Sequence, residues 1–281
     1  MEVLANKIDF AVVLSVKNAN PNGDPLNGNR PRQNYDGYGE ISDVCLKRKI
    51  RNRLQDMEEK IFVQSDEKKS DEFKSLKDRA DSIPELKKAD KDKDKDLFAK
   101  IACETWADVR SFGQVFAFKG DVLSVGVRGP VSIHPATSLH PIDISSIQIT
   151  KSVNSTTSDK KGADTMGMKH RVDFGVYVFY GSINTQLAEK TGFTRRDAEK
   201  IQEALRTLFE NDSSSARPEG SMEVHRLYWW EHASKMGQYS SAKVHRSLKM
   251  ELQTEEPNSF EDVHLYVEEL DGLEVKEYEG I

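Results

Sequence analysis

A run of five cationic residues with no acidic residue among them lies between positions 44 and 54: Lys47, Arg48, Lys49, Arg51 and Arg53. If this segment is helical, a rotation of about 100° per residue places Lys47 and Arg51 roughly 40° apart, with Arg48 on their flank. Binding a phosphate backbone requires fixed positive charge on a rigid element. The run therefore favours a helix that contacts nucleic acid. The alternative is an ordinary solvated helix face, which usually mixes charges of both signs.

Two turn-rich segments carry further groups that suit a phosphate. Residues 18–32 read NANPNGDPLNGNRPR, in which glycines allow close backbone approach and the candidate contacts are Asn20, Asn22, Arg30 and Arg32. Residues 213–220 offer hydroxyl groups, a glycine and one cation, with Ser214 and Arg217 as candidate contacts. The alternatives are a plain long turn for the first segment and a flexible link between a helix and a strand for the second.

A third polar segment, residues 151–171, carries five cations against two acids and includes Thr-Met-Gly-Met. Twenty residues without regular structure are uncommon in a compact domain and are usually functional. A protruding hairpin could insert apolar side chains between bases while its cations lie near the backbone. The candidate contacts are Lys151, Met166, Met168, Lys169, His170 and Arg171. His170 could instead act as a ribonuclease base, but a phosphate-binding role needs no partner acid.

The sequence offers little else for catalysis. Its seven histidines are scattered, and its two cysteines, Cys45 and Cys103, have no metal-ligand spacing. It contains no HExxH, GxSxG or phosphate-binding glycine-loop motif. We therefore expect no catalytic residue, no metal and no cofactor.

Charge is unevenly distributed along the chain. The net charge of −6 over 281 residues argues weakly against a nucleic-acid partner. From residue 251 onward, however, there are eleven acidic residues and one basic residue, so residues 1–250 hold 40 basic and 36 acidic residues. The acidic tail, residues 251–281, is either a solvated edge or a surface that meets a basic neighbour. No apolar run reaches the roughly 18 residues of a membrane span, and the start lacks a signal-peptide pattern. The sequence thus predicts a cytoplasmic protein without a membrane partner.

Apolar periodicity predicts the elements that would position these groups. Alternation favours strands at residues 8–16, 172–180 and 222–230, with shorter ones at 114–118, 122–127, 147–149 and 263–267. Apolar stripes favour helices at 42–60, 97–108 and 194–209, the last opened by a Thr-x-x-Asp cap. Residues 64–96 carry 21 charges in 33 positions, and we expect a solvated insertion that is partly helical and partly disordered. Without insertions, the order is the βαββαβ of an α+β, ferredoxin-like or RRM-type domain.

Seven segments in this order resemble the backbone subunit of the type I-C CRISPR effector complex (Cascade), in the repeat-associated RNA-binding superfamily. They cover most of residues 10–232: NANPNGDPLNGNRPR, ISDVCLKRKIRN, DVRSFGQVFAF, SVGVRGPVSI, ITKSVN, TMGMKHRVDFGVYVFYGSIN and SSSARPEGSMEVHRLYWWEH. The resemblance implies a single domain, residues 1–281, with an RRM-like palm. Fingers, a charged helical insertion, would occupy residues 62–110, and a thumb hairpin residues 151–171. Lys47 and Arg51 would be phosphate contacts of the palm helix.

The resemblance also implies the partners. These are a CRISPR RNA, the target DNA strand paired to it, other copies of this chain, and other Cascade subunits including the guide-processing and large subunits. The subunit would bind the guide without cutting it. Two alternatives remain: a metal-dependent ribonuclease that uses Asp24 or Asp36 on the same palm, and an RNA-binding module that does not oligomerise.

Overall fold

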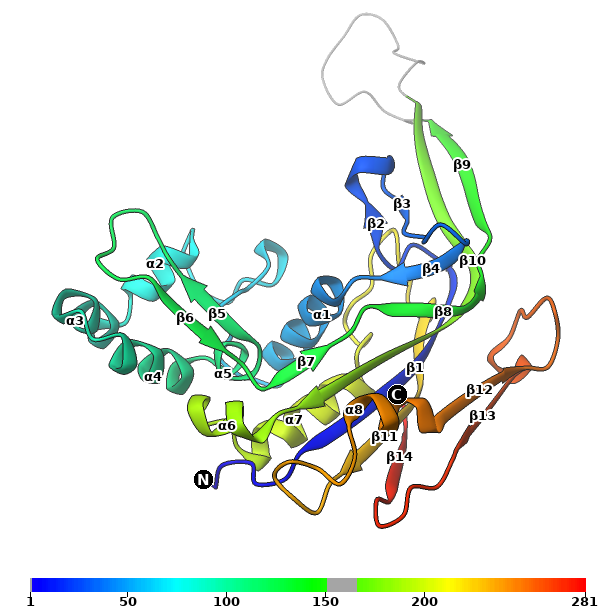
Figure 1. The fold of residues 1–281 in the computed structure, drawn as a ribbon. Helices are drawn as coiled ribbons and strands as arrows, with labels where there is room; N and C mark the ends of the chain where they lie inside the picture. The colour runs from blue at the N-terminus through cyan, green and yellow to red at the C-terminus, as the bar shows by residue number, and fades with distance from the viewer. Residues whose placement is uncertain (1, 151–165) are drawn as a thin grey trace, which may run out of the picture.

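A twisted antiparallel sheet forms the centre of the computed structural model, which describes residues 2–150 and 166–281. The long strands β1 (Ile8–Ala19) and β10 (Met166–Ile183) pair along nearly the whole of β1. With β11 (Met222–Glu231) and β8 (Ala136–Pro141), they give the order β11–β1–β10–β8. This is the arrangement of a βαββαβ palm, and Figure 1 shows its strands crossing the middle of the molecule. The predicted α+β, RRM-like palm is confirmed.

Shorter strands extend the palm sheet. The edge strands are β14 (Val275–Glu279), which pairs with β11, and β4 (Tyr38–Ile41), which pairs with β8. Strands β7 (Val131–Ile133) and β9 (Ile144–Thr150) pair with opposite ends of β10. A small separate hairpin, β2 (Gly23–Asp24) and β3 (Arg30–Pro31), encloses a 3-10 turn, Pro25–Asn27.

Two helices cover one face of the sheet. Helix α1 (Asp43–Asp56) begins at Ser42, whose hydroxyl accepts a hydrogen bond from the Cys45 amide. Helix α7 (Arg195–Arg206) begins with the predicted capping box of Thr194 and Asp197. The apolar stripes predicted for both helices are buried in the main core, which also contains side chains of β1: Leu46, Ile50, Leu54, Ala198, Ile201, Leu205 and Leu208.

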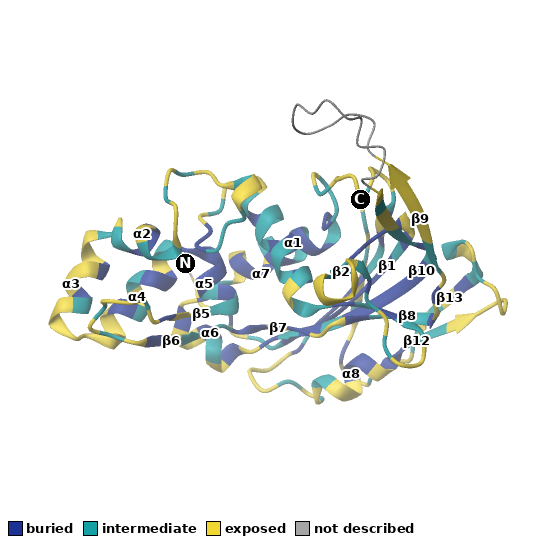
Figure 2. Ribbon diagram, turned by 90° about the horizontal axis from the view of Figure 1, so that it is seen from above, coloured by how far each residue is buried: buried dark blue, intermediate teal, exposed yellow. Residues whose placement is uncertain are grey.

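The opposite face of the sheet is also covered. Helix α8 (Ser241–Ser247) and the hairpin of β12 (Leu248–Leu252) and β13 (Val263–Val267) pack on it, and Figure 2 shows α8 on the side of the sheet away from α1. The sheet therefore offers no open aromatic platform at this face. Tyr177 and Phe179 of β10 are fully buried on the α1 side, in the main core.

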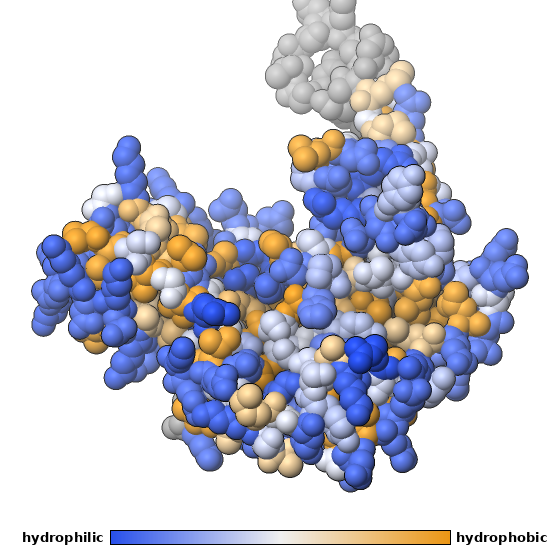
Figure 3. All heavy atoms as spheres, viewed as in Figure 1, coloured by the Kyte–Doolittle hydropathy of each residue, from blue (hydrophilic) through white to orange (hydrophobic). Residues whose placement is uncertain are grey.

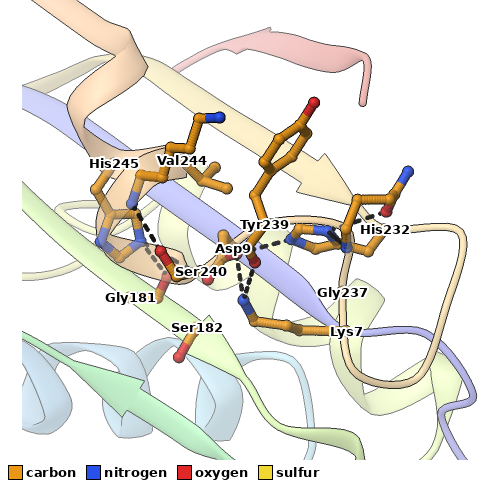
Figure 4. A network of polar contacts seen from close by, with 12 residues as sticks. Lys7, Asp9, Gly181, Ser182, His232, Gly237, Tyr239, Ser240, Val244 and His245 are labelled. Carbon is orange, nitrogen blue, oxygen red and sulfur yellow. Dashed lines mark hydrogen bonds and ion pairs between the residues drawn. The ribbon is translucent and has the colours of Figure 1, made fainter. Parts of the chain in front are cut away.

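A buried polar network fastens α8 to the sheet (Figure 4). Asp9 of β1 is fully buried, and its Oδ2 lies 2.8 Å from His232 Nε2 and 2.9 Å from Lys7 Nζ. Lys7 also donates to the Tyr239 carbonyl oxygen, and His245 of α8 lies 3.0 Å from the Gly181 carbonyl oxygen. Burial by itself raises the pKa of Asp9, but contacts with His232, Ser241 and Lys7 hold that pKa below its ordinary value.

The charged insertion is a folded unit with a second hydrophobic core (Figure 1). The expectation that residues 64–96 are partly helical is confirmed, but that of partial disorder is wrong, since Ala80, Leu86 and Ala89 are buried with Phe62 and Phe98 from the flanking segments. Its helices are α2 (Leu76–Asp81), α3 (Pro84–Asp92), α4 (Lys95–Thr105) and α5 (Ala107–Phe112), with a 3-10 turn at Asp66–Lys68. Most of the charges lie on the outer surface of the unit, but Arg79 is buried, where it pairs with Asp71 and donates to the Phe62 carbonyl oxygen.

The short strand pair predicted near residues 114–127 belongs to this insertion and not to the palm. Strands β5 (Gly113–Phe116) and β6 (Val125–Arg128) form their own two-stranded sheet, and Phe116 and Val125 complete the second core. The unit therefore extends past the expected limit of the fingers at residue 110. In the palm, β8 takes the place of the second strand.

The remaining described elements connect these layers: helix α6 (Thr185–Thr191) follows β10, and a 3-10 turn at Phe260–Asp262 precedes β13. None of the helices in residues 2–150 and 166–281 is long and apolar enough to cross a bilayer.

Candidate nucleic-acid interface

The segment predicted to be a loop is in part a β-ribbon. Met166, Met168, Lys169, His170 and Arg171 all lie in β10, where they pair with β9. The expectation of an irregular segment over residues 151–171 is therefore wrong for 166–171. Lys151 and residues 152–165 of the expected thumb lie outside the described residues. In Figure 2, β9 is exposed where it rises from the sheet.

The register of this ribbon divides the predicted contacts between its two faces. Directly paired residues share a face, so Met166, Met168 and His170 lie on one side with Ser146 and Gln148. The side chains of Lys169 and Arg171 lie on the opposite face, with Ile147 and Ile149. Met166 is 60% exposed and Met168 is 54% exposed. The predicted apolar wedge and the two predicted cations thus cannot contact the same point of a ligand.

One predicted contact of the first loop meets the ribbon directly. Arg30 of β3 donates from Nη1 to the Ser146 hydroxyl oxygen at 2.9 Å, and the same oxygen lies 2.8 Å from His170 Nδ1. Figure 1 shows β2 and β3 beside β9 and β10. The structure therefore brings Arg30, His170 and the two methionines to one side of the ribbon, although 116 positions separate Arg30 from Ser146.

The other predicted residues of the first loop hold the loop in place. Asn20 is buried, and its Nδ2 donates to the Asn29 carbonyl oxygen at 2.7 Å. Asn22 Oδ1 accepts a hydrogen bond from the Ser42 amide at 2.9 Å and so joins the loop to the start of α1. Arg32 Nη2 lies 3.5 Å from Asp24 Oδ1 and remains partly exposed. Arg30 and Arg32 are thus the members of this loop whose cationic side chains reach solvent.

Helix α1 carries its cations as predicted, but acids from distant elements neutralise several of them. Arg51 Nε lies 3.0 Å from Asp108 Oδ2, and both side chains are largely buried. Lys49 pairs with Asp212, and Arg53 pairs with Asp56 and Glu210. Burial lowers the pKa of Lys49, an effect that Asp212 opposes. Most of this positive charge therefore stabilises the fold.

Lys47 and Arg48 are bound less firmly to other elements. Lys47 Nζ lies 3.0 Å from Asp43 Oδ2, one turn earlier on the same helix, and the two side chains are partly exposed, at 26% and 36%. Arg48 donates to the Val63 carbonyl oxygen and has no acid within ion-pair distance in the described part of the chain. An ion pair between partly exposed side chains one turn apart in a helix contributes only about 0.3–0.5 kcal/mol, so Asp43 holds Lys47 weakly. Among the described residues, these two cations of α1 form no ion pair with another element.

The segment near Ser214 and Arg217 lines a cavity of about 320 Å³. Arg217 Nε lies 3.0 Å from Asp212, the same carboxylate that pairs with Lys49. Glu210, Glu219 and Glu223 also line the cavity, and Ser214 sits in a tight turn beside it. The surplus of acids around Arg217 makes this cavity electrostatically unfavourable for phosphate.

The surface is hollowed between the insertion and the side of the molecule that carries β2, β3 and the ribbon (Figure 3). Helix α1 lies between these two sides in Figure 1. Lys47 belongs to α1 and Arg30 to β3. One face of the ribbon carries Met166, Met168 and His170 together with Ser146. This face contacts β3 through the hydrogen bond from Arg30 to Ser146.

The two aspartates of the ribonuclease alternative lie apart from any set of metal ligands. Asp24 Oδ1 accepts a hydrogen bond from the Leu26 amide, and Asp36 is exposed in the turn before β4. Residues 2–150 and 166–281 contain no group of three or more His, Cys, Asp and Glu side chains arranged to hold a metal ion.

Ser146 contacts both Arg30 and His170, but it was not among the residues predicted for this surface. The predicted strand covered only residues 147–149, whereas β9 begins at Ile144. The alternation of Ser146, Gln148 and Thr150 with Ile147 and Ile149 was the available signal, because it gives a longer strand with one polar face.

Comparison with known proteins identifies the family. Residues 6–268 match the family model described as "CRISPR-associated protein Cas7". The CRISPR-associated protein Cas7 of Haloferax volcanii is 28% identical over 228 residues, which cover 75% of this chain and 66% of the relative. The chain thus spans just under two thirds of that relative's length. A chain of a solved "CRISPR RNA-guided surveillance complex, pre-nicking" has the same fold, with a TM-score of 0.50 at 14% identity, covering 80% of this chain and 78% of that one. Since the family model spans most of the sequence, the chain belongs to the CRISPR-associated Cas7 family.

Proposed function

We propose that this chain is the non-catalytic, RNA-binding backbone subunit of a type I-C Cascade complex. Copies of it would line up along the spacer of a CRISPR RNA and present the guide for pairing with a target DNA strand. Its protein partners would be further copies of itself and other Cascade subunits, including the guide-processing and large subunits. The observation that carries this proposal is the match of residues 6–268 to the Cas7 family.

The geometry supports an RNA path over the hollow side of the molecule. Cations that reach solvent on different elements, Lys47 on α1 with Arg30 and Arg32 in the first loop, would contact the phosphate backbone. Met166 and Met168 are exposed apolar side chains on the ribbon, suited to pack against a displaced base. The type I-C assignment is supported by the seven sequence segments that resemble that subunit.

Lys47→Ala is expected to weaken guide-RNA binding equally for all guide sequences and to reduce the salt dependence by about 0.7 in the log–log slope, since one phosphate contact is lost. Arg51→Ala should behave differently. It leaves the buried Asp108 carboxylate without its cation, so its main effect is expected on stability. Filter binding of guide RNA at several salt concentrations, together with urea unfolding, measures both effects.

Lys100→Ala is the matched control, because this lysine of α4 is 70% exposed and has only a 4.0 Å contact with Glu104. If Lys47→Ala binds RNA with unchanged affinity and slope, the start of α1 does not touch the guide.

The purified protein is expected to leave guide RNA intact in the presence of Mg²⁺, since the proposed role is binding alone. Gel analysis of labelled guide over several hours provides the test. Cleavage that disappears in Asp24→Ala or Asp36→Ala would instead establish the ribonuclease alternative. A single small complex with one protein per guide would establish the module that does not oligomerise.

A further inference from the structure

The face of the ribbon that lies opposite the two methionines is a sheet face without a partner. Ile147 and Ile149 of β9 are 43% and 49% exposed on it, and β9 itself carries no charged residue. The register places Lys169 and Arg171 of β10 on the same face, with Lys169 directly opposite Ile147. Arg171 lies 3.5 Å from Asp173, whereas Lys169 forms no ion pair with another described residue. This face therefore combines exposed aliphatic side chains with a net positive charge.

The chemistry of this face suits a protein surface better than RNA. Single-stranded RNA is held largely by aromatic side chains on which bases stack, and the face presents two isoleucines instead. The exposed methionines and the contact with Arg30 belong to the other face of the ribbon. Aliphatic side chains flanked by cations complement a surface that offers apolar groups among acids.

The hairpin of β12 and β13 in this same chain has that complementary chemistry. Its inner face packs on the palm sheet. On its outer face Tyr266 is 40% exposed, and the Tyr266 hydroxyl lies 3.0 Å from Glu251 Oε1. The loop between the two strands, residues 253–262, adds the exposed Glu255 and Glu256. The hairpin thus presents an aromatic side chain among carboxylates.

The carboxylates of this outer face are not neutralised within the described part of the chain. The cation of the hairpin, Lys249, pairs with Glu268 at 3.4 Å, which leaves Glu251 and the two loop acids without a cation. In Figure 1 the ribbon rises above the sheet, whereas β12 and β13 leave it at the side. Both surfaces are therefore open to another molecule.

We propose that the Ile147 and Ile149 face of the ribbon docks on the outer face of the β12–β13 hairpin of a neighbouring copy. Lys169 and Arg171 would then pair with the hairpin acids while the isoleucines cover Tyr266. This inference rests on the proposed function, in which copies line up along the guide, and it names the surfaces by which they meet. A contact between two different surfaces can repeat from copy to copy, as a filament requires.

A charge-reversal experiment tests this contact, because every copy carries both surfaces. Lys169→Glu with Arg171→Glu is expected to raise by about tenfold the protein concentration needed to fill a guide RNA with several copies, since like charges then face each other. Glu255→Lys with Glu256→Lys should have a similar effect. A chain that carries all four changes should fill the guide like the unmodified protein. Native mass spectrometry counts the copies on each guide.

An added-charge control separates a restored contact from a general attraction to RNA. Asp92→Lys with Glu104→Lys adds the same positive charge at exposed positions of α3 and α4. Combined with the ribbon reversal, this pair should not restore filling. Equal restoration by the control pair and by the hairpin pair would overturn the proposal, because net charge alone would then explain the rescue.

Two further outcomes contradict the inference in distinguishable ways. The ribbon reversal could lower the log–log salt slope by about 0.7 or more on a short RNA that holds one copy, without rescue by the hairpin pair. That result would assign Lys169 and Arg171 to RNA and overturn the contact between copies. Binding of the unmodified protein to a long guide as one copy would instead contradict the proposed function, on which this contact depends.

Discussion

Replacement of Asp9 by alanine is expected to lower the free energy of unfolding by about 3–5 kcal/mol. Asp9 is fully buried, and its carboxylate is the common partner of Lys7 at 2.9 Å and His232 at 2.8 Å (Figure 4). Without it, the Lys7 ammonium loses its counter-ion, and His232, which is also fully buried, loses its acceptor. Urea unfolding followed by tryptophan fluorescence measures the change, because Trp229 and Trp230 lie in the adjacent strand β11.

Asp92→Ala is the control for this variant, since Asp92 is exposed in the last turn of α3. It should change the free energy of unfolding by less than about 0.5 kcal/mol. Equal stability of the two variants would show that the network contributes nothing net to the fold.

The same network predicts a pH dependence of stability. The pKa of Asp9 is lower in the folded protein than its ordinary value, so the folded state favours the ionised form. Its contribution is therefore fully present above the unfolded pKa of about 4, and is lost as the pH falls through the lower folded pKa. The free energy of unfolding of Asp9→Asn should therefore fall less between about pH 5 and pH 2 than that of the unmodified protein. Urea unfolding at several pH values in this range measures the difference.

The elements predicted correctly are those whose buried positions are apolar and regularly spaced. The stripes of α1 and α7 and the alternation of β1 are visible in sequence because Leu, Ile and Val occupy the inner positions. Strand β8 was missed for the opposite reason. Its buried positions are Ala136, Ser138 and His140, so burial leaves no hydrophobic alternation to read.

The cations of α1 show why the site was harder to predict than the fold. Local sequence gives the number of these cations, and the helix predicted for them is confirmed. It cannot show that Arg51 meets Asp108, 57 residues away, or that Lys49 meets Asp212, 163 residues away. These acids approach α1 only after the insertion and the segment after α7 have folded onto it. A cationic run in sequence therefore overstates the charge available to a ligand.

The insertion was misread for a related physical reason. Its 21 charges among residues 64–96 gave an average composition typical of disorder. Helices α3 and α4 nevertheless bury Leu86, Ala89, Phe98 and Ala102 around the aromatic cluster of Phe62, Trp106 and Phe116. A few large apolar residues, some of them outside the charged stretch, are enough to organise a small helical unit.

The junction between this insertion and the palm depends on one carboxylate. Asp108 is 1% exposed, and it accepts hydrogen bonds from the Phe62 amide at 2.7 Å and the Val63 amide at 3.1 Å. Its Oδ2 also accepts a hydrogen bond from Arg51 Nε of α1 at 3.0 Å. Asp108 thus satisfies two backbone donors at the start of the insertion and a cation of the palm helix at once.

Asp108→Ala is expected to destabilise the protein by about 3–5 kcal/mol, because it leaves a largely buried guanidinium unpaired and removes the acceptor of two amides. Asp108→Asn should cost less, since one carbonyl oxygen can still accept from the Phe62 amide while the ion pair is lost. Urea unfolding measures the order of these variants, with the exposed Glu104→Ala of α4 as control. Because the contacts are made at the junction, limited proteolysis of Asp108→Ala should cut first between α1 and α2. First cleavage within the palm strands would show that Asp108 supports the whole fold and not this junction.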